Sequence, residues 1–239
     1  MRGEGGGTRR TAGDSVRAMV LAAGRGERMR PITDTLPKPL VQVAGKPLIG
    51  YHLSRLAEAG IREVVVNLSW LGEKIRAALG DGREYGLSIA YSDEGPAPLE
   101  TGGGIFKALP LLGPDPFLVV NGDTWSDIDY GRLGLEDTAN GRIVLVANPT
   151  HNPRGDFGVE GDVVVDREVD RFTYSGVGVY RPEFFVGCSP GKFPMLPLLK
   201  RAIAARLLRG ELHRGEWCDV GTPERLATLD AEVRARAVK

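Results

Sequence analysis

Cysteine is scarce in this sequence: only Cys188 and Cys218 occur. Two cysteines are too few for a disulfide framework, which favours a reducing compartment, the cytoplasm. The sequence also lacks any run of about eighteen apolar residues, which excludes a membrane-spanning helix. Net charge is absent as well, because 31 lysines and arginines balance 31 aspartates and glutamates. This neutrality argues against binding to nucleic acid or to an anionic membrane, so a phosphate site must be a local cluster.

Several familiar catalytic patterns are missing too. The three histidines, His52, His151 and His213, are too scattered for a metal triad, and no Gly-x-Ser-x-Gly sequence occurs. Cys218 has no histidine partner nearby in the sequence, so we interpret it as a buried apolar residue. Residues 1–17 are glycine-rich and polar without an apolar segment, which predicts a disordered extension rather than a signal peptide.

What the sequence does contain is an alternation of apolar strands and helices. Short apolar runs predict buried strands at 18–22, 64–66, 117–120 and 143–146, and alternation predicts a strand at 87–91. Amphipathic spacing predicts helices at 48–59, 70–79 and 105–112. Later segments predict strands within 158–165 and 173–180, and helices at 195–208 and from 223 onward. We therefore expect an α/β fold: a single-domain, Rossmann-like, mostly parallel twisted sheet with helices on both faces.

A glycine-rich segment follows the first predicted strand. Its small residues would let backbone N–H groups approach a triphosphate and a base: Ala22, Ala23, Gly24 and Gly26. Arg28 and Arg30 add positive charge. A dinucleotide-binding fingerprint would need glycine where Met29 stands, and no Walker A lysine follows. Alone, this segment is equally typical of an ordinary glycine turn.

The sequence Pro37-Lys38-Pro39 comes next. Two prolines fix the backbone around Lys38, so this lysine has little conformational entropy left to lose on binding. A lysine held in this way suits a phosphate contact, although most lysines are simply solvated.

A second glycine-rich segment runs from residue 99 to 104. Three consecutive glycines cost entropy, so we expect a ligand or a tight turn at Gly102 and its neighbours. Glu100 or Thr101 would meet the edge of a base. A carboxylate accepts a hydrogen bond from N3–H of uracil or thymine and repels the N3 acceptor of cytosine. A helix cap at Thr101 with an exposed Glu100 is the alternative interpretation.

Two aspartates are candidate magnesium ligands. Asp123 follows the most apolar strand, and Asp219 lies among apolar residues far along the chain. Magnesium at phosphoryl- and nucleotidyl-transfer sites commonly uses one or two carboxylates plus substrate phosphates. Taken singly, each aspartate is also typical of a turn or a helix cap. In the later half, Asp156, Tyr174 and Gly176 would meet sugar hydroxyls, although they too occur in ordinary turns.

In this order, the segments resemble the sugar nucleotidyltransferase family. The resemblance is carried by residues 21–29, 37–39, 122–123 and 217–222. A closer resemblance is to its branch of short bacterial N-acetylmuramic acid-1-phosphate uridylyltransferases, carried by residues 26–31, 99–109 and 154–157. It implies a domain over 18–239, with a nucleotide-binding half at about 18–125 and a sugar-phosphate-binding half at about 126–239.

The resemblance also implies a reaction and its residues. A sugar-1-phosphate, N-acetylmuramic acid 1-phosphate of cell-wall recycling, would attack UTP and release pyrophosphate, with no other partner required. UTP would be bound by Gly26, Glu27, Arg28 and Lys38, of which Arg28 and Lys38 would be catalytic. The sugar phosphate would be bound by Asn121 and Asp156, and Mg²⁺ by Asp123 and Asp219. No residue pattern specifies an oligomeric state.

Alternatives remain open within and outside this class. Within it are glucose-1-phosphate with dTTP or UTP, mannose-1-phosphate with GTP, and phosphocholine with CTP. Outside it is a catalytically silent, nucleotide-sensing regulatory subunit of the same fold, which should have lost Lys38 or a metal-binding aspartate. A dinucleotide-dependent dehydrogenase is disfavoured by the missing third glycine.

Overall fold

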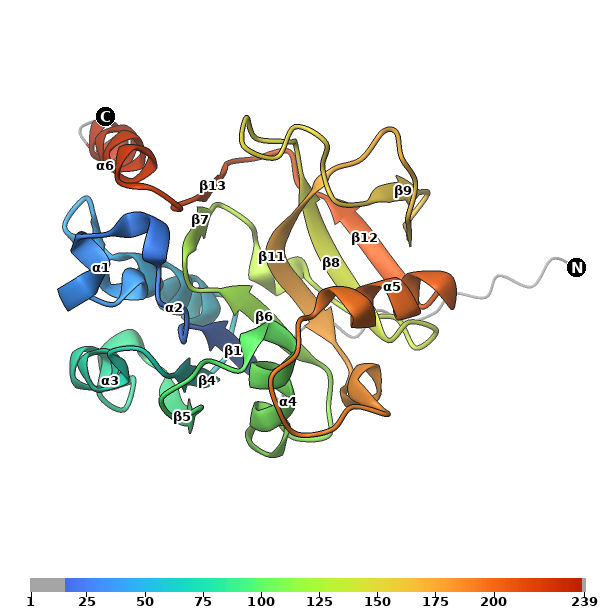
Figure 1. Cartoon of the computed structure of the whole chain (residues 1–239), viewed down its shortest axis with the longest axis horizontal. Coiled ribbons are helices and arrows are strands. Elements are labelled where there is room, and N and C mark those ends of the chain that lie inside the picture. Colours follow the sequence, from blue (N-terminus) through green and yellow to red (C-terminus); the bar gives the residue numbers. More distant parts are fainter. Residues whose placement is uncertain (1–15, 238–239) are drawn as a thin grey trace, which may run out of the picture.

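The computed structural model describes residues 16–237 (Figure 1). Residues 1–15 of the predicted extension lie outside this part. Val16 and Arg17 belong to the folded unit: Val16 packs against the core, and the Arg17 carbonyl accepts a hydrogen bond from the backbone N–H of Leu118. No helix within residues 16–237 is long and apolar enough to cross a membrane.

A nine-stranded sheet forms the centre of the molecule, in the order β5-β4-β1-β6-β11-β8-β12-β10-β9. One half is parallel and consists of β5 (Ser88–Asp93), β4 (Glu63–Leu68), β1 (Ala18–Leu21) and β6 (Phe117–Asn121). The other half consists of β11 (Thr173–Tyr180), β8 (Gly141–Val146), β12 (Leu208–Leu212), β10 (Val163–Val165) and β9 (Gly158–Glu160). Strand β11 runs antiparallel to both neighbours, which makes the sheet mixed. The predicted α/β class is confirmed.

Helices cover both faces of the sheet, as predicted. Helices α2 (Leu48–Glu58) and α3 (Gly72–Leu79) lie on one face, and α4 (Glu100–Leu112) and α5 (Leu196–Ala204) on the other. A hydrophobic core lies on each face of the sheet, and alternate residues of a strand pack into one or the other. In β1, Val20 packs on the α2 side and Met19 on the α4 side. Because both of their faces are buried, β1, β4 and β6 read as apolar runs in the sequence.

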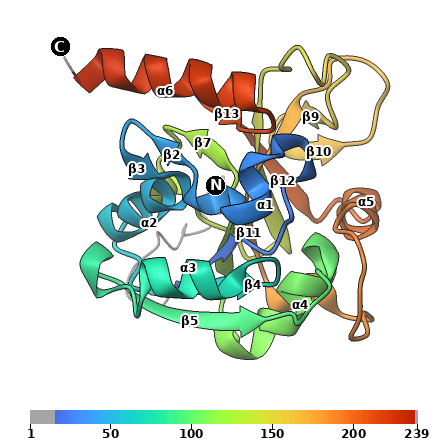
Figure 2. The ribbon, with the colours of Figure 1, turned by 60° about the vertical axis from the view of Figure 1, so that its left-hand side comes forward.

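A third core joins parts of the chain that are far apart in sequence. The C-terminal helix α6 (Pro223–Ala237) lies beside the small hairpin of β2 (Gln42–Val43) and β3 (Lys46–Pro47) (Figure 2). The backbone N–H of Ala44 in the hairpin donates to Asp230 of α6 over 2.7 Å. Met29, Trp125 and Leu229 are buried together in this core. It therefore ties the glycine-rich segment, the chain after β6 and the C-terminal helix into one unit.

Two element predictions were wrong in their bounds, and one element was missed. Helix α4 begins at Glu100 rather than at residue 105, so the three glycines lie inside it. The helix predicted over 195–208 ends at Ala204, and Leu208 already begins β12. A two-stranded ladder of β7 (Thr124–Ser126) and β13 (Trp217–Asp219) was not predicted.

Candidate active site

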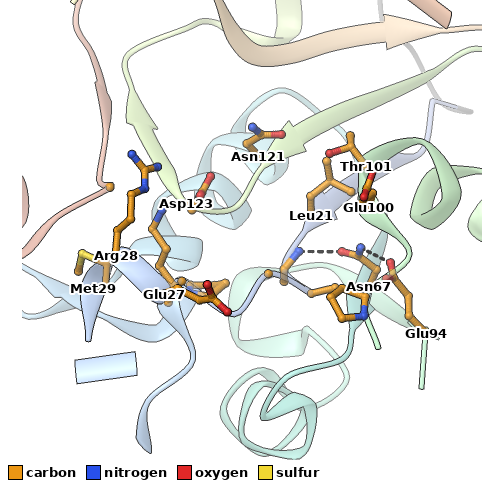
Figure 3. Close-up of a pocket in the computed structure, with 18 residues that line it drawn as sticks. Leu21, Glu27, Arg28, Met29, Asn67, Glu94, Glu100, Thr101, Asn121 and Asp123 are labelled. Atoms are coloured by element: carbon orange, nitrogen blue, oxygen red, sulfur yellow. Dashed lines mark hydrogen bonds and ion pairs between the residues drawn. The ribbon is translucent and has the colours of Figure 1, made fainter. Parts of the chain in front are cut away.

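A cavity of about 460 Å³ lies beyond the carboxyl ends of β1, β4 and β6, where ligands gather in sheets of this kind. Figure 3 shows Arg28 and Asp123 on one side of it and Glu100 and Thr101 on the other. Its walls include most of the predicted nucleotide-binding residues: Ala22, Ala23, Gly24, Gly26, Glu27, Arg28, Lys38, Glu100 and Thr101.

A second cavity, of about 330 Å³, continues from the first. Arg28, Asn121 and Asp123 line both cavities. The second is also lined by His151, Asn152, Tyr174, Trp217 and Asp219. Volumes of several hundred Å³ are those of sites for small organic ligands. The two cavities together thus provide adjoining places for two small ligands.

The glycine-rich segment packs closely against the segment that contains Lys38. Gly26 has φ of +65°, and a Cβ there would lie 3.1 Å from Cβ of Lys38, so both the backbone and the space require glycine. The Gly26 carbonyl accepts a hydrogen bond from the Thr33 hydroxyl over 2.8 Å. The segment is therefore held at a fixed distance from Lys38, with its backbone facing the cavity.

Lys38 is not a solvated lysine. It belongs to the short 3-10 helix Lys38–Leu40, and only 6% of its side chain is exposed. Its Nζ donates to Oδ2 of Asp123 over 2.6 Å and lies 3.9 Å from Oδ1 of Asp219. The structure thus brings together both predicted metal ligands, and the ammonium of Lys38 lies within 4 Å of each.

The β7–β13 ladder explains how residues so distant in sequence meet. Asp219 pairs with Thr124, the residue after Asp123, and the backbone N–H of Val220 donates to the Asp123 carbonyl over 3.2 Å. Beneath this strand, the buried His52 ring bonds the Thr124 carbonyl over 2.7 Å and the Tyr130 hydroxyl over 2.8 Å. Burial lowers the pKa of His52 to about 4, so its ring is neutral and supports the Asp123 backbone.

Positive groups surround Asp219. Nη1 of Arg225 donates to its Oδ2 over 2.8 Å, and Nη2 of Arg28 lies 3.8 Å away. His151 Nε2 lies 3.4 Å from the same oxygen. Burial, followed by the Arg225 charge, lowers the pKa of His151, and Asp219 opposes this shift. The two guanidinium groups therefore place positive charge on the side of the cavity next to Asp219, which suits an anionic ligand.

Two carboxylates and no third acidic or histidine ligand form the candidate metal centre. Within residues 16–237, no group of three or more His, Cys, Asp or Glu side chains could hold a metal ion. Magnesium takes oxygen ligands and often keeps only one or two protein carboxylates beside substrate phosphates. The donor set of Asp123 and Asp219 fits such an ion, with the remaining positions open to phosphate or water.

A chain of hydrogen bonds on the opposite side of the cavity was missed by sequence reasoning. The backbone N–H of Ala22 donates to Asn67 Oδ1 over 2.7 Å, and Asn67 Nδ2 donates to Glu94 over 2.6 Å (Figure 3). The other oxygen of Glu94 accepts from the Leu99 N–H over 2.6 Å. The chain links the glycine-rich segment to the start of α4. The sequence does contain one signal for this chain: Asn67 is an amide that directly follows three valines in a buried strand.

The three consecutive glycines are explained by packing rather than by a ligand. A Cβ on Gly102 would lie 2.6 Å from the Phe193 ring, and one on Gly104 would overlap the Glu94 carboxylate. Gly102 itself does not line the cavity, whereas Glu100 and Thr101 do. Glu100 has φ of +61°, in the left-handed region that favours glycine.

Two residues predicted to touch the sugar lie behind the cavity wall. Asp156 accepts hydrogen bonds from Asn152 Nδ2 over 3.1 Å and from the Tyr174 N–H over 2.8 Å, so its carboxylate is engaged by protein. Gly176 has φ of +82° and leaves space for the Asn121 side chain. Tyr174 lines the second cavity, and its hydroxyl bonds that of Tyr180 over 2.8 Å.

Residues 17–173 match the family model described as Nucleotidyl transferase. The chain belongs to the nucleotidyl transferase family. It is 52% identical to the N-acetylmuramate alpha-1-phosphate uridylyltransferase of Neisseria meningitidis, over 90% of this chain and 97% of that relative. It is 37% identical to the protein of the same name from Caulobacter vibrioides, over 91% and 96% of the two chains. These relatives confirm the predicted membership of the sugar nucleotidyltransferases.

Solved structures share this fold. A Bacillus anthracis protein assigned as a glucose-1-phosphate thymidylyltransferase superposes with a TM-score of 0.81 at 18% identity, over 92% of this chain and 95% of that chain. HddC from Yersinia pseudotuberculosis, complexed with GMP-PN, gives 0.72 at 21% identity, over 91% and 99%. These similarities confirm the predicted fold.

Proposed function

We propose that this nucleotidyltransferase joins UTP to N-acetylmuramic acid 1-phosphate, giving UDP-N-acetylmuramic acid and pyrophosphate. The observation that carries the proposal is the 52% identity to a curated uridylyltransferase of that specificity over nearly the full length of both chains. The charged cavity supports it, since its glycine-rich segment, Lys38 and two aspartates are what such chemistry needs. We place the reaction in the cytoplasm and in the recycling of peptidoglycan.

The triphosphate would lie along the glycine-rich segment, between Arg28 and Lys38. A phosphate oxygen of the sugar-1-phosphate would attack the α-phosphorus of UTP; this O–P bond forms while the bond to the β-phosphate oxygen breaks, and pyrophosphate leaves. The nucleophile is already anionic, so no general base is required. The difficulty is bringing two polyanions together, which positioning and charge neutralisation overcome.

Asp123 and Asp219 would hold Mg²⁺ in this site. The bound ion would supply positive charge next to the reacting phosphates. Arg225, His52 and the β7–β13 ladder would keep the two carboxylates facing each other.

The base and the sugar would occupy opposite ends of the joined cavities. The base would lie near Glu100 and Thr101, on the side that Asn67 and Glu94 organise. The sugar would enter the second cavity beside Asn121 and Tyr174, with Asp156 and Gly176 supporting those residues from behind. Residues 18–125 would thus serve mainly the nucleotide, and residues 126–239 mainly the sugar phosphate.

A substrate matrix tests this proposal. Pyrophosphate release would be measured with UTP, dTTP, GTP and CTP, each combined with the 1-phosphates of N-acetylmuramic acid, N-acetylglucosamine, glucose and mannose. We expect the highest kcat/KM for UTP with N-acetylmuramic acid 1-phosphate. A different preferred pair would refute the proposed substrates. Nucleotide binding without pyrophosphate release from any pair would instead favour a silent regulatory protein.

A further inference from the structure

The ammonium of Lys38 lies where a cation between two carboxylates would be expected. Its Nζ is 2.6 Å from Asp123 Oδ2 and 3.9 Å from Asp219 Oδ1. Within the described residues, it is the only positively charged side chain within 4 Å of both aspartates. Lys38 therefore already offsets one of the two negative charges of the pair to which we assign the metal.

The stem of Lys38 cannot move far. Two prolines flank the residue, and its carbonyl accepts the Val41 N–H over 3.1 Å. Gly26 packs so closely that even an added Cβ there would lie 3.1 Å from Cβ of Lys38. Only the outer methylenes and the ammonium can change place. Lys38 also lines the first cavity, so a small swing takes its charge from Asp123 toward a ligand in that cavity.

We propose that Lys38 closes the two-aspartate site to divalent cations in the free enzyme and opens it when nucleotide phosphates attract its ammonium. The inference rests on the proposed function, which assigns the metal to Asp123 and Asp219. A divalent ion and the ammonium cannot both contact Asp123 Oδ2 at short range without strong repulsion. Phosphate charge removes the conflict, because it gives the ammonium another partner.

Neighbouring charges strengthen this effect. Arg225 and Arg28 already lie within 4 Å of Asp219 and disfavour an additional cation there. A free site with these groups and Lys38 carries more positive than negative charge. Nucleotide and metal should therefore assist each other's binding, and by linkage the assistance is reciprocal. The metal site would be completed only when there is a triphosphate to act on.

Manganese binding to the free protein tests the first half of the proposal. Free Mn²⁺ would be counted by electron paramagnetic resonance during titration of the wild type, Lys38→Met and Lys38→Arg, without nucleotide. Lys38→Met removes the charge and keeps the volume, so we expect it to bind Mn²⁺ at least about tenfold more tightly than the wild type. Lys38→Arg keeps the charge and should stay as weak as the wild type.

Further variants test whether the added Mn²⁺ affinity of Lys38→Met comes from the two-aspartate site. The double variant Lys38→Met/Asp123→Asn should lose the tight site, and Lys200→Met, which removes an exposed lysine paired with Asp166, should resemble the wild type. Circular dichroism would check folding, and Lys38→Gln replaces any Lys38→Met protein that does not fold. Equal Mn²⁺ affinity of the wild type and Lys38→Met would overturn the proposal, as would tight binding that survives Asp123→Asn.

UTP binding in EDTA tests the second half. Calorimetry should give at least about tenfold weaker binding of UTP to Lys38→Met than to the wild type, because the ammonium is the partner of the phosphates. If Lys38→Met bound UTP as tightly as the wild type, the proposed exchange of the ammonium from Asp123 to the nucleotide phosphates would be overturned. Neither measurement depends on turnover. If the wild type closes its metal site in this way but prefers other substrates, the proposed function alone is refuted. If uridylyl transfer is normal but the metal site of the free protein is open, only this inference is refuted.

Discussion

The two sides of the cavity are built in different ways. The side that we propose to face the triphosphate comes mainly from one stretch, residues 22–38, placed at the end of the parallel strand β1. The side that we propose to face the sugar phosphate is assembled from β6, β7, β11 and β13, whose residues lie up to about a hundred positions apart. A local segment can be recognised as a motif, whereas a site made by strand pairing is visible only after folding.

Asp123→Asn breaks the link between the two sides and should have the largest effect. The variant keeps the shape of the side chain but removes a charge that contacts Lys38 and faces Asp219. We expect turnover to fall about 10³-fold or more, with a cooperative thermal transition retained. Asp137→Asn, which changes a side chain that is 97% exposed, is the control. Near-normal magnesium-dependent turnover in Asp123→Asn would remove this residue from the metal site.

Arg28→Ala probes the triphosphate side. The guanidinium lines both cavities, so we expect kcat to fall about 10²-fold through lost stabilisation of developing charge. Arg30→Ala is a matched control, because Arg30 pairs with Asp34 and lines neither cavity. Steady-state kinetics with both substrates separates kcat from KM. A change confined to KM would mean that Arg28 only binds the ground state.

Arg225→Met probes the sugar-phosphate side. Arg225 acts through Asp219, whose carboxylate it bonds over 2.8 Å, so it is a positioning residue. We expect kcat/KM for the sugar phosphate to fall about tenfold, while the metal-free affinity for UTP stays unchanged. The control is Arg234→Met on the same helix, where the lost partner is Asp230. Equal losses for UTP and sugar phosphate would show that the two sides are not separable.

Lowering the pH should reduce the stability of the fold through His52, whose ring bonds the backbone of the residue after Asp123. The pKa of His52 is lowered to about 4 from its ordinary 6.5, so between these values the unfolded chain binds a proton that the folded chain does not. This part of the stability is present above pH 6.5 and is lost as the pH falls toward 4. Its loss between pH 7.5 and 5 should be about 2 kcal/mol. Urea unfolding would measure it, and His52→Gln should show a flatter dependence; an identical pH dependence in both proteins would contradict the buried neutral ring.

Strands β1, β4 and β6 of the parallel half could be predicted because they are buried on both faces and read as apolar runs, whereas β5 is half exposed and gives an alternating pattern. Strand β12 was missed although Leu208–Leu212 alternates apolar and charged residues, because it follows helix α5 so closely that Leu208 was included in the predicted helix. The ladder of β7 and β13 consists of three-residue strands that carry no periodicity. Such elements are fixed by pairing partners elsewhere in the chain.

The candidate site divides in the same way. Gly26, Lys38 and Asp123 were predicted because glycine, proline and the end of an apolar strand give local signals. Asn67 and Glu94 were missed because their role depends on a contact between two strands and a helix start. The glycines around Gly102 were predicted to mark a ligand or a tight turn, whereas they lie inside helix α4, where the Phe193 segment and Glu94 occupy the space that side chains would need.

The most direct measurement of the central claim follows two phosphorus labels through one reaction. UTP labelled at the α-phosphorus, or in parallel at the γ-phosphorus, would be incubated with N-acetylmuramic acid 1-phosphate and Mg²⁺. Attack at the α-phosphorus predicts that the α label appears in UDP-N-acetylmuramic acid and the γ label in pyrophosphate. Release of the α label as free UMP, or transfer of the γ label to the sugar, would contradict uridylyl transfer at this site.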